Sequence, residues 1–521
     1  MSNLFTLMSF SGQLTSAIAV GLSASLLFEF LLLVPRSSVC FKRGFTGYFV
    51  HSASWLSFFF VCLLLFQRPW FAVLLTTSFQ LLLLAVNFVK YRSLREPFIL
   101  QDFEYFYDMI RHPRLYLPFF GIWNAILGAA MFIALVYGAL MLETSLLNVV
   151  ALNTFLGVIS VFLALSLWAL YMAAERLPLP TLRPEDDLRI YGLYASFWGY
   201  FLAFRRTPKL SPHAVYDAAV GVETTNDLPD LVVVQSESFF DPRVSYPSVQ
   251  SSVLQHYDRV VKQSLSFGQL KVPAWGANTV RTESSFLTGL QPEQMGIHQF
   301  NPYWYLSRNH LPNLVSRLKS LGYKTICIHP YPVEFYRRDL VFPKLGFDQF
   351  IDIGGFSAGA KDGQYISDRA VSEKVKQVLG EERGPCFVFT ITMENHGPLH
   401  LESDEGIDTT AFYREAPSAK SSDLTVYLRH LKNADQMIDQ LTQYLSSRAR
   451  KSYLCWYGDH VPVMAEVYKQ MGEPVAETPY FIWCNQIAEQ QGGKQDIGVD
   501  QLSVELFERT VLCRAVKTAI S

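Results

Sequence analysis

Long runs of apolar residues dominate the first third of the chain. Five of them, each roughly 19 to 26 residues long, match the length that a helix needs to cross the hydrocarbon layer of a membrane. Only helices and closed barrels satisfy their backbone hydrogen bonds inside lipid. The pattern therefore predicts a five-helix transmembrane domain over residues 1–174, with spans at Leu14–Val34, Tyr48–Phe66, Trp70–Val89, Phe119–Leu142 and Val149–Ala174.

Two polar residues lie inside these apolar spans, Glu29 and His51. An ionisable side chain within a span can mark a functional polar contact. Both residues also lie near the end of a span, from which a side chain can extend to the membrane surface. The sequence leaves both interpretations open.

The stretch after the fifth apolar run changes character. Prolines and charged residues in Glu175–Arg189 predict that the chain leaves the membrane there. The following Ile190–Phe204 is apolar and aromatic, but about 15 residues are few for a crossing. Because Arg205 and Arg206 follow directly, we expect an amphipathic helix at the level of the lipid headgroups, within a linker over residues 175–227.

From Leu231 onward, short apolar runs alternate with segments of helical periodicity, such as Asp423–Ser446. This rhythm predicts an α/β domain over residues 228–521 with a central, mostly parallel sheet. Sheets of this kind bind ligands beyond the carboxyl ends of their strands. The predicted strands are LVVVQ, TICIH, CFVFTIT, SYLCWY and YFIWC.

Residues with suitable chemistry stand where these strands end. Glu237 follows LVVVQ, and Asp459 and His460 follow SYLCWY, while Thr279 precedes a helix-like run over Val280–Leu287. Carboxylate and imidazole ligands suit manganese, zinc or magnesium. A threonine hydroxyl needs a cation or a base to become a nucleophile. We therefore expect one divalent ion, preferably Mn²⁺, held by all four residues, although Thr279 and Glu237 could each be an ordinary helix cap.

Charge and cysteine content narrow the classes of function. With 44 basic and 46 acidic residues, the net charge of −2 gives no basic surface for nucleic acid. The seven cysteines show no CxxC spacing. Since Cys327, Cys386 and Cys455 lie in strand-like runs, buried free thiols are expected instead of a zinc knuckle or a disulfide framework.

The order Glu237, Thr279, Asp459 and His460, in an α/β domain after five apolar segments, resembles the lipoteichoic acid synthase and phosphoglycerol transferase family of the alkaline phosphatase/sulfatase superfamily. In that family the nucleophile lies four residues before a glutamate, as Thr279 lies before Glu283. The resemblance covers nearly the whole chain. It implies an alkaline phosphatase/sulfatase-like catalytic domain carried by a membrane domain.

The same resemblance implies a set of residues that bind the substrate. His329 and Arg338 match the family's histidine and arginine that contact the glycerophosphate group, and Tyr336 lies where the family often carries a tryptophan. His396 in TMENHGP matches the substrate-site histidine. The planar fork of Arg338 suits phosphate oxygens. A plainer alternative pairs Arg338 with Asp339 or another surface acid.

Two departures bear on the substrate. Tyr331 lies where some members carry an acidic contact to glycerol, and Arg337 where they carry asparagine, so phosphoryl chemistry is indicated more firmly than the headgroup. The C-x-P-x-R motif, from which sulfatases make formylglycine, is missing from the sequence. Sulfate-ester hydrolysis is therefore disfavoured.

The resemblance implies a two-step transfer. Thr279 attacks a phosphatidylglycerol-like membrane lipid, diacylglycerol leaves, and a hydroxyl of an envelope glycan, glycolipid or polymer takes the glycerophosphate group. A phosphoethanolamine transferase or phosphodiesterase with the same threonine and metal is an alternative. A non-catalytic membrane sensor is a third, against which the intact metal ligands argue. The sequence does not indicate an oligomeric state.

The loop charges and the family resemblance disagree about the side of the membrane on which the α/β domain lies. The basic residues in the loops after the first and third spans predict that these loops are cytoplasmic, which places the domain after five spans in the cytoplasm. Members of the resembled family work on the outer face. We therefore expect a bacterial cell (inner) membrane protein with its catalytic domain on the extracytoplasmic side. The loop residues are Arg36, Lys42, Arg43, Lys90, Arg92, Arg95, Arg111 and Arg114.

Overall fold

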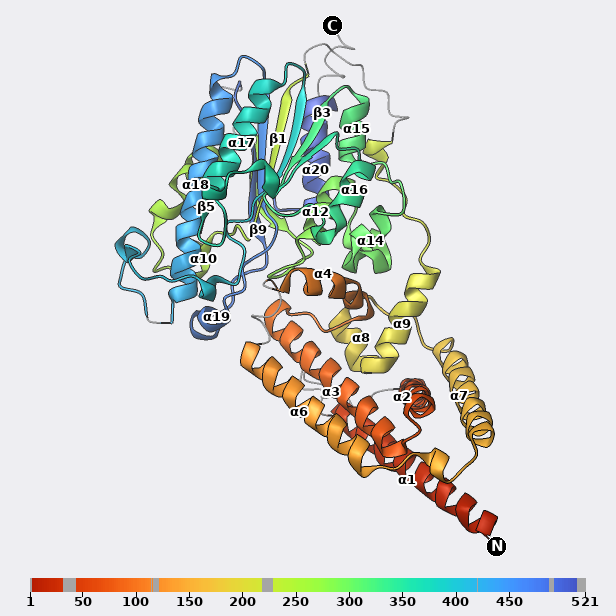
Figure 1. Cartoon of the computed structure of the whole chain (residues 1–521). Helices are drawn as coiled ribbons and strands as arrows, with labels where there is room; N and C mark the ends of the chain where they lie inside the picture. The colour runs from red at the N-terminus through yellow and green to blue at the C-terminus, as the bar shows by residue number, and fades with distance from the viewer. Residues whose placement is uncertain are drawn as a thin grey trace. The chain divides into compact units, whose positions relative to one another are not determined.

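The computed structural model describes residues 2–30, 44–113, 115, 121–217, 228–418, 420–486 and 492–512 (Figure 1). The chain divides into two compact units, Met1–Pro208 and Lys209–Ser521. Each unit has its own core and is described by itself.

The first unit contains five helices that are long and apolar enough to cross a membrane. This confirms the predicted spans in the part of the chain that the structure describes; residues 31–34 and 119–120 of those spans lie outside it. Two short elements, η2 (Leu100–Tyr105) and α4 (Phe106–Arg111), lie between the third and fourth helices. The five helices are α1 (Ser2–Phe30), α2 (Phe45–Phe66), α3 (Pro69–Leu94), α6 (Ile122–Leu142) and α7 (Leu152–Ala174).

Helix α2 is the centre of this bundle and packs against α1, α3 and α7. Its Trp55 and Phe59 are almost fully buried and stack on one another with ring centroids 5.3 Å apart. Helix α6 instead leaves large apolar side chains exposed, among them Trp123 and Leu127. Such side chains are stable only against lipid or another apolar surface, which agrees with a membrane location.

Glu29 and His51 pair with one another inside the first unit. The Oε1 atom of Glu29 lies 3.2 Å from Nδ1 of His51, and both residues are at most 2% exposed. His51 Nε2 lies 2.9 Å from the hydroxyl oxygen of Ser25, which donates to Gln80 Oε1 at 2.6 Å. The Glu29 carboxylate also accepts from the amide of Leu193 at 3.2 Å. The two side chains therefore form a polar contact between helices, and extension to a membrane surface is the wrong interpretation.

The segment predicted as one amphipathic helix is divided by Gly192, whose φ of 79° lies in the left-handed region. Helix α8 spans Pro184–Tyr191, and helix α9 spans Leu193–Arg206, so the main helix begins three residues later than Ile190. Helix α9 packs against α2 and α7 and buries Tyr200. Its placement at the level of the headgroups stays a prediction.

The second unit is built on an eight-stranded sheet with the order β10-β2-β9-β8-β1-β7-β3-β4. Strand β9 is antiparallel to both of its neighbours, and the remaining pairs are parallel. This confirms the mostly parallel sheet. The strands are β1 (Asp230–Ser236), β2 (Ser266–Lys271), β3 (Lys324–Ile328), β4 (Gln349–Ile351), β7 (Cys386–Ile391), β8 (Ser452–Gly458), β9 (Thr478–Cys484) and β10 (Ile497–Gly498), with a separate pair β5 (Lys361–Asp362) and β6 (Tyr365–Ile366).

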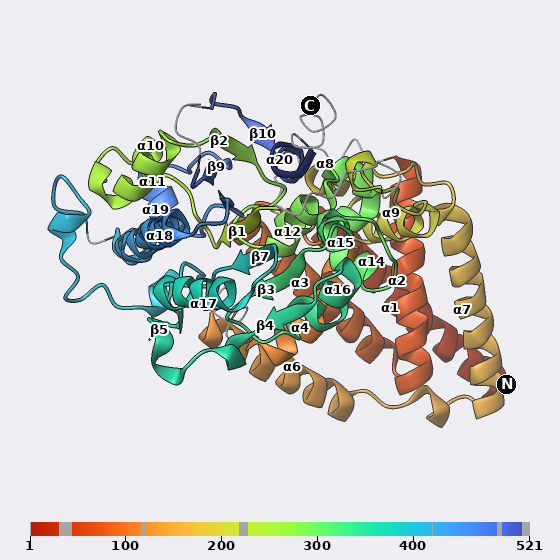
Figure 2. The same cartoon turned by 90° about the horizontal axis from the view of Figure 1, so that it is seen from above.

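Helices cover both faces of this sheet because side chains alternate along each strand. Val232 and Val234 of β1 pack in one core with α11, α17 and α18, while Leu231 and Val233 pack in the other with α12, α14, α15, α16 and α20 (Figure 2). The helices are α10 (Pro242–Ser245), α11 (Gln255–Val261), α12 (Thr279–Thr288), α13 (Pro292–Met295), α14 (Pro302–Leu306), α15 (Leu314–Ser320), α16 (Arg338–Leu345), α17 (Asp368–Glu381), α18 (Ser422–Ser447), α19 (Ala465–Met471) and α20 (Val499–Phe507).

The predicted cysteines behave as expected. Cys327, Cys386 and Cys455 are buried, free thiols on β3, β7 and β8. Burial raises the pKa of the Cys455 thiol well above its usual value. These residues therefore serve as small apolar side chains of the core.

Candidate active site

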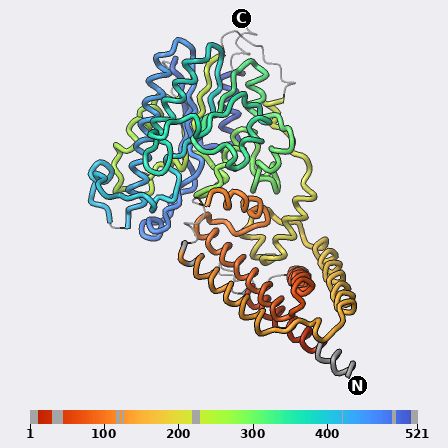
Figure 3. The backbone as a smooth tube through the Cα atoms, in the orientation of Figure 1, coloured from red at the N-terminus to blue at the C-terminus, as the bar shows by residue number. Residues whose placement is uncertain are grey.

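The register of the central strands brings the first two predicted ligands together. Ser236 at the end of β1 pairs with Gly458 at the end of the parallel strand β8. The next residues are Glu237 and Asp459, so both carboxylates leave the same edge of the sheet. The tube in Figure 3 shows β1, β7 and β8 side by side, although long segments of chain separate them. A Cβ atom on Gly458 would lie 1.9 Å from the Phe239 carbonyl oxygen, so only glycine allows this close approach.

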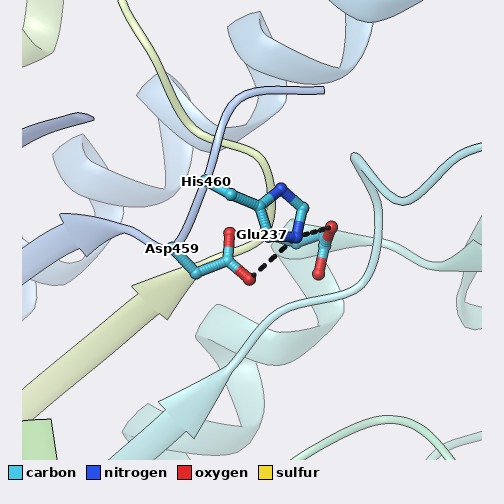
Figure 4. Close-up of side chains that lie close together, drawn as sticks. All are labelled: Glu237, Asp459 and His460. Atoms are coloured by element: carbon cyan, nitrogen blue, oxygen red, sulfur yellow. Dashed lines mark ion pairs between the residues drawn. The ribbon is translucent and has the colours of Figure 1, made fainter. Parts of the chain in front are cut away.

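Glu237, Asp459 and His460 form a group that could hold a metal ion, with ligand atoms all within 4.8 Å of one another. His460 Nε2 lies 3.6 Å from Glu237 Oε1 and 3.4 Å from Asp459 Oδ2 (Figure 4). All three residues are at most 2% exposed. Three of the four predicted ligands therefore meet, each following a strand of the sheet.

Hydrogen bonds from neighbouring groups engage part of this cluster and leave two of its ligand atoms without a hydrogen-bond partner among the described residues. The Ser238 amide donates to Asp459 Oδ1 at 2.8 Å, and the Ser238 hydroxyl donates to Glu237 Oε1 at 2.8 Å. His460 Nδ1 lies 3.0 Å from the Val461 carbonyl, which fixes the proton on Nδ1 and leaves a lone pair on Nε2. Within the described chain, Asp459 Oδ2 and His460 Nε2 are buried and have no hydrogen-bond partner.

The electrostatics of the cluster also fit a cation. Burial, followed by the charge of Asp459, raises the pKa of Glu237 to about 8. Two buried carboxylates repel each other and lose hydration, and a divalent ion removes both penalties. Carboxylate oxygens with one imidazole nitrogen suit Mn²⁺, Zn²⁺ or Mg²⁺. The donor set therefore fits the expected metal.

Thr279 is the first residue of α12 and is 8% exposed. The position before it belongs to Asn278, so Thr279 is not the cap of this helix, and Asn278 makes no side-chain capping bond. One turn on, the Thr282 hydroxyl donates to the Asp459 carbonyl at 2.8 Å, which fastens the start of α12 to the metal-binding loop. Uncapped amides at a helix start suit a phosphate group. Ligation of the ion by Thr279 itself stays a prediction.

His329 and Arg338 meet as well, but in a different setting from the surface pair considered above. Arg338 is 1% exposed and binds Glu283 of α12, with Nη2 to Oε2 at 2.8 Å and Nε to Oε1 at 3.3 Å. Its Nη1 lies 3.3 Å from Nε2 of His329. The partner of Arg338 is thus a buried acid, and pairing with Asp339 or a surface acid was wrong.

Tyr336 lies in a strained turn directly before α16. Both Tyr336 and Arg337 have positive φ angles, 56° and 57°, which cost non-glycine residues about 1–3 kcal/mol each. The Arg338 guanidinium carbon lies 5.4 Å from the centre of the Tyr336 ring, within the range of a cation–π contact. The turn therefore places the aromatic ring against Arg338, although contact with a substrate stays a prediction.

His396 lies beyond the end of β7, on the same edge of the sheet, and is half-buried. Its Nδ1 is 2.6 Å from the Gly397 carbonyl, and the Tyr365 hydroxyl is 3.4 Å from the same nitrogen. Burial lowers the pKa of His396, while the hydrogen bond to Gly397 and the charge of Asp459 oppose this shift. The imidazole is therefore neutral near pH 7, and its role at a substrate stays a prediction.

A network below His396 was missed at the sequence level. Glu394 accepts from the Asp368 amide at 2.6 Å and lies 2.9 Å from His430 Nδ1, and His430 Nε2 lies 3.0 Å from Glu402. Burial alone would lower the pKa of His430, but the hydrogen bonds to Glu394 and Glu402 raise it to about 9. This charged histidine fastens the loop that carries His396 to α18.

Three other residues of the site were also missed: Ser238, Thr282 and Thr392. Thr392 accepts from the Glu237 amide at 3.0 Å. The positions of Ser238 beside Glu237 and of Thr282 one turn after Thr279 were available as signals. The contact of Thr392 depends on the β1–β7 pairing, which a single sequence does not show.

Residues 229–510 match the family model described as Sulfatase, and the chain belongs to the sulfatase family. This confirms the expected membership in the alkaline phosphatase/sulfatase superfamily. The chain is 28% identical over 286 residues to a putative cyclic beta-1,2-glucan modification protein of Rhizobium meliloti, covering 52% of this chain and 43% of that protein. The chain thus spans under half the length of this relative.

Two further relatives extend the comparison. The capsular polysaccharide biosynthesis protein RkpI of Rhizobium meliloti is 27% identical over 449 residues, covering 80% of this chain and 77% of the relative. The lipoteichoic acid synthase-like protein YvgJ of Bacillus subtilis is 22% identical over 229 residues, covering 42% and 35%.

A solved structure shares the architecture of both units. The integral membrane lipooligosaccharide phosphoethanolamine transferase A from Neisseria meningitidis matches with a TM-score of 0.50 and 12% identity, covering 89% of this chain and 95% of that protein. At this identity the match shows the fold. It confirms a five-helix membrane part followed by a sulfatase-like domain.

Removal of metal should lower the stability of the second unit. A ligand at about 100 times its Kd stabilises the folded state by about 2.7 kcal/mol, so Mn²⁺ should raise the unfolding temperature and a chelator should reverse the rise. Asp459→Asn should abolish this shift, measured by thermal unfolding in detergent. Asp435→Asn, which alters a buried acid outside the site, is the control and should keep it. An equal shift in both variants would contradict the assignment.

The protonated His430 should make stability depend on pH. Its pKa is raised from 6.5 to about 9, so its stabilising effect is full below pH 6.5 and is lost as pH rises through 9. The effect is on the order of 3 kcal/mol. Between pH 6.5 and 9, the free energy of unfolding, measured by chemical unfolding, should therefore fall less in His430→Gln than in the wild type. The control His400→Gln, which alters an exposed histidine, should follow the wild type. Parallel curves for all three proteins would refute the charged state of His430.

Proposed function

We propose that the chain is a membrane-anchored, metal-dependent phosphoglycerol transferase. The observation that carries this proposal is the buried cluster of Glu237, Asp459 and His460, in which two ligand atoms have no hydrogen-bond partner among the described residues. Thr282 fastens this cluster to the helix that begins at Thr279. Membership of the sulfatase family and the resemblance of the motifs to phosphoglycerol transferases support it.

The proposed reaction is a double displacement on phosphorus. Thr279 Oγ1 forms a bond to the phosphorus of a phosphatidylglycerol-like lipid, and the bond from phosphorus to the diacylglycerol oxygen breaks. The proton lost by Thr279 is balanced by the proton that the diacylglycerol hydroxyl gains. In the second step an acceptor hydroxyl forms a bond to the phosphorus of the phospho-threonine, and the bond from phosphorus to Thr279 Oγ1 breaks. The acceptor loses its proton, and Thr279 regains one.

The remaining side chains have defined tasks in this proposal. Glu237, Asp459, His460 and Thr279 hold the ion, for which we propose Mn²⁺. When bound, the ion withdraws charge from the threonine hydroxyl and the phosphoryl oxygens. The positive charge of Arg338 and the amides at the start of α12 favour the phosphate group. The His396 imidazole, neutral near pH 7, is suited to carry a proton to or from the attacking and leaving hydroxyls.

The proposed partners are a membrane lipid as donor and an envelope glycan or lipid-linked polymer as acceptor. The relatives support this class of acceptor, since their names refer to a cyclic glucan, a capsular polysaccharide and lipoteichoic acid. The five apolar helices would keep the second unit at the surface where such a lipid resides.

A phosphoethanolamine transferase is the second candidate function. The fold shared with the Neisseria meningitidis protein over 89% of this chain favours it, because that protein's name describes such a transfer. The two candidates use the same nucleophile and differ in the group that remains on Thr279. A phosphodiesterase differs only in the second step, where water replaces the acceptor.

We propose that the second unit lies on the extracytoplasmic side, as in the resembled family. Fewer free positive charges lie in the loops that predict the opposite side than the sequence indicates. Lys90 is half-buried and forms ion pairs with Glu96 and Asp102, each at 2.7 Å, so it is not a free cation of that loop. Residues 31–43, which contain three of the other basic residues, lie outside the described residues.

Sidedness can be measured with external protease on intact spheroplasts. Cleavage after Leu210 should release a fragment of the second unit, because that unit should face the medium. The same cleavage must appear in lysed cells, and a cytoplasmic protein must stay intact in the spheroplasts. Protection of the second unit until lysis would reverse the proposed orientation.

Loss of the nucleophile should abolish the reaction. Thr279→Ala should lower diacylglycerol release from labelled phosphatidylglycerol by on the order of a millionfold, as removal of other enzymatic nucleophiles does, whereas Thr279→Ser keeps a hydroxyl and should retain measurable turnover. Mass spectrometry of the wild-type protein should detect a glycerophosphate adduct on Thr279. An adduct of phosphoethanolamine would favour the second candidate, and substantial turnover by Thr279→Ala would refute both.

A further inference from the structure

Glu283 is a fully buried carboxylate in the middle of α12, and none of the roles assigned above includes it. It is 0% exposed. It binds Arg338 of α16 through both oxygens, and its Oε1 accepts a hydrogen bond from the Tyr303 hydroxyl of α14. One carboxylate therefore joins three helices beside the candidate active site.

The hydrogen bonds of Arg338 show which of its N–H groups this contact with Glu283 leaves available. A guanidinium carries five N–H groups. Glu283 accepts from Nε and from one N–H of Nη2, and His329 accepts from one N–H of Nη1. Two N–H groups, one on each terminal nitrogen, remain without a partner in the part of the chain that the structure describes. Such a pair is the fork that binds two oxygens of a phosphate group.

His329 holds the other side of Arg338. Its Nδ1 lies 3.2 Å from the Ile391 carbonyl, so Nδ1 carries the proton and Nε2 accepts from Arg338. Burial and the charge of Arg338 lower the pKa of His329 well below its usual value. Both ring nitrogens are thus engaged with protein groups. The imidazole orients Arg338 and has no further N–H to donate to a substrate.

The position of Glu283 on α12 connects Arg338 to the proposed nucleophile. Residues four apart lie on the same face of a helix, so Glu283 follows Thr279 by one turn. The helix is also tied to Asp459 through Thr282. All ten residues of α12 are buried, so the surrounding core holds Thr279 and Glu283 in place on this helix.

We propose that Glu283 is a positioning residue of the active site, which holds the Arg338 guanidinium against α12 so that its two remaining N–H groups meet the phosphate attacked by Thr279. The inference rests on the proposed function and adds to it a residue that sets the distance between nucleophile and phosphate-binding cation. His329 assists by fixing the opposite side of Arg338.

The alternative is that the pair only stabilises the fold. Removal of one partner of a buried ion pair is strongly destabilising in either case. A second ion pair in the same unit provides a control: Asp230 is 0% exposed and binds Nη2 of the half-buried Arg448 at 2.7 Å. Asp230 begins β1, at the opposite end of the strand from Glu237. Its loss should affect stability alone.

The test measures the rate at which Thr279 acquires an adduct from labelled phosphatidylglycerol in the full-length protein with Mn²⁺. Glu283→Asp keeps the charge but shortens the side chain, and misplacement by about 1 Å costs on the order of a hundredfold in rate. We expect that loss in Glu283→Asp and a larger one in Glu283→Gln, with the Mn²⁺-dependent rise in unfolding temperature retained. Asp230→Asn should lose stability but form the adduct at the wild-type rate.

Each result decides between the alternatives. An unchanged adduct rate in Glu283→Asp overturns the inference, as do equal losses of rate in Glu283→Gln and Asp230→Asn. If Glu283→Gln does not fold, the comparison of Glu283→Asp with Asp230→Asn decides. A wild-type protein that forms no adduct overturns the proposed function before any variant is compared, and the inference with it.

Discussion

The repulsion between two buried carboxylates, Glu237 and Asp459, is the constraint on which the site depends. Ser236 of β1 pairs with Gly458 of the parallel strand β8, and Glu237 and Asp459 are the residues that follow them. The strand pairing therefore forces the two carboxylates together. Hydrogen bonds from Ser238 engage one oxygen of each, and the raised pKa of Glu237 shows that they do not remove the cost of burial. A divalent ion relieves this cost, so the fold that creates the repulsion also creates affinity for the ion.

The same edge of the sheet sets the positions of the other groups. Helix α12 begins at Thr279, is fastened to the loop of Asp459 by Thr282, and reaches Arg338 through Glu283. In the first unit a different polar contact, between Glu29 and His51, joins α1 to α2 and caps the start of α9. Each unit thus contains a fully buried carboxylate that holds helices together: Glu29 at the start of α9 and Glu283 between α12 and α16. An unpaired charge at either position would be costly.

Much of this arrangement followed from the sequence because it depends on local pattern. Apolar length predicted the five helices, and alternating runs predicted β1, β3, β7, β8 and β9. Strands β2, β4 and β10 were missed, since they have only two to six residues and contain no long run of apolar residues. The partner of Arg338 was also missed, because Glu283 meets it through tertiary packing across 55 residues of chain. Likewise, the start of α9 is set by Gly192 and the Glu29 carboxylate, which apolar pattern does not show.

The most direct measurement is an anomalous diffraction map of the full-length protein loaded with Mn²⁺. The account predicts one strong peak bounded by the carboxylate oxygens of Glu237 and Asp459, Nε2 of His460 and the hydroxyl oxygen of Thr279. An ion bound elsewhere, or a Thr279 hydroxyl outside the coordination sphere of the ion in this cluster, would contradict it.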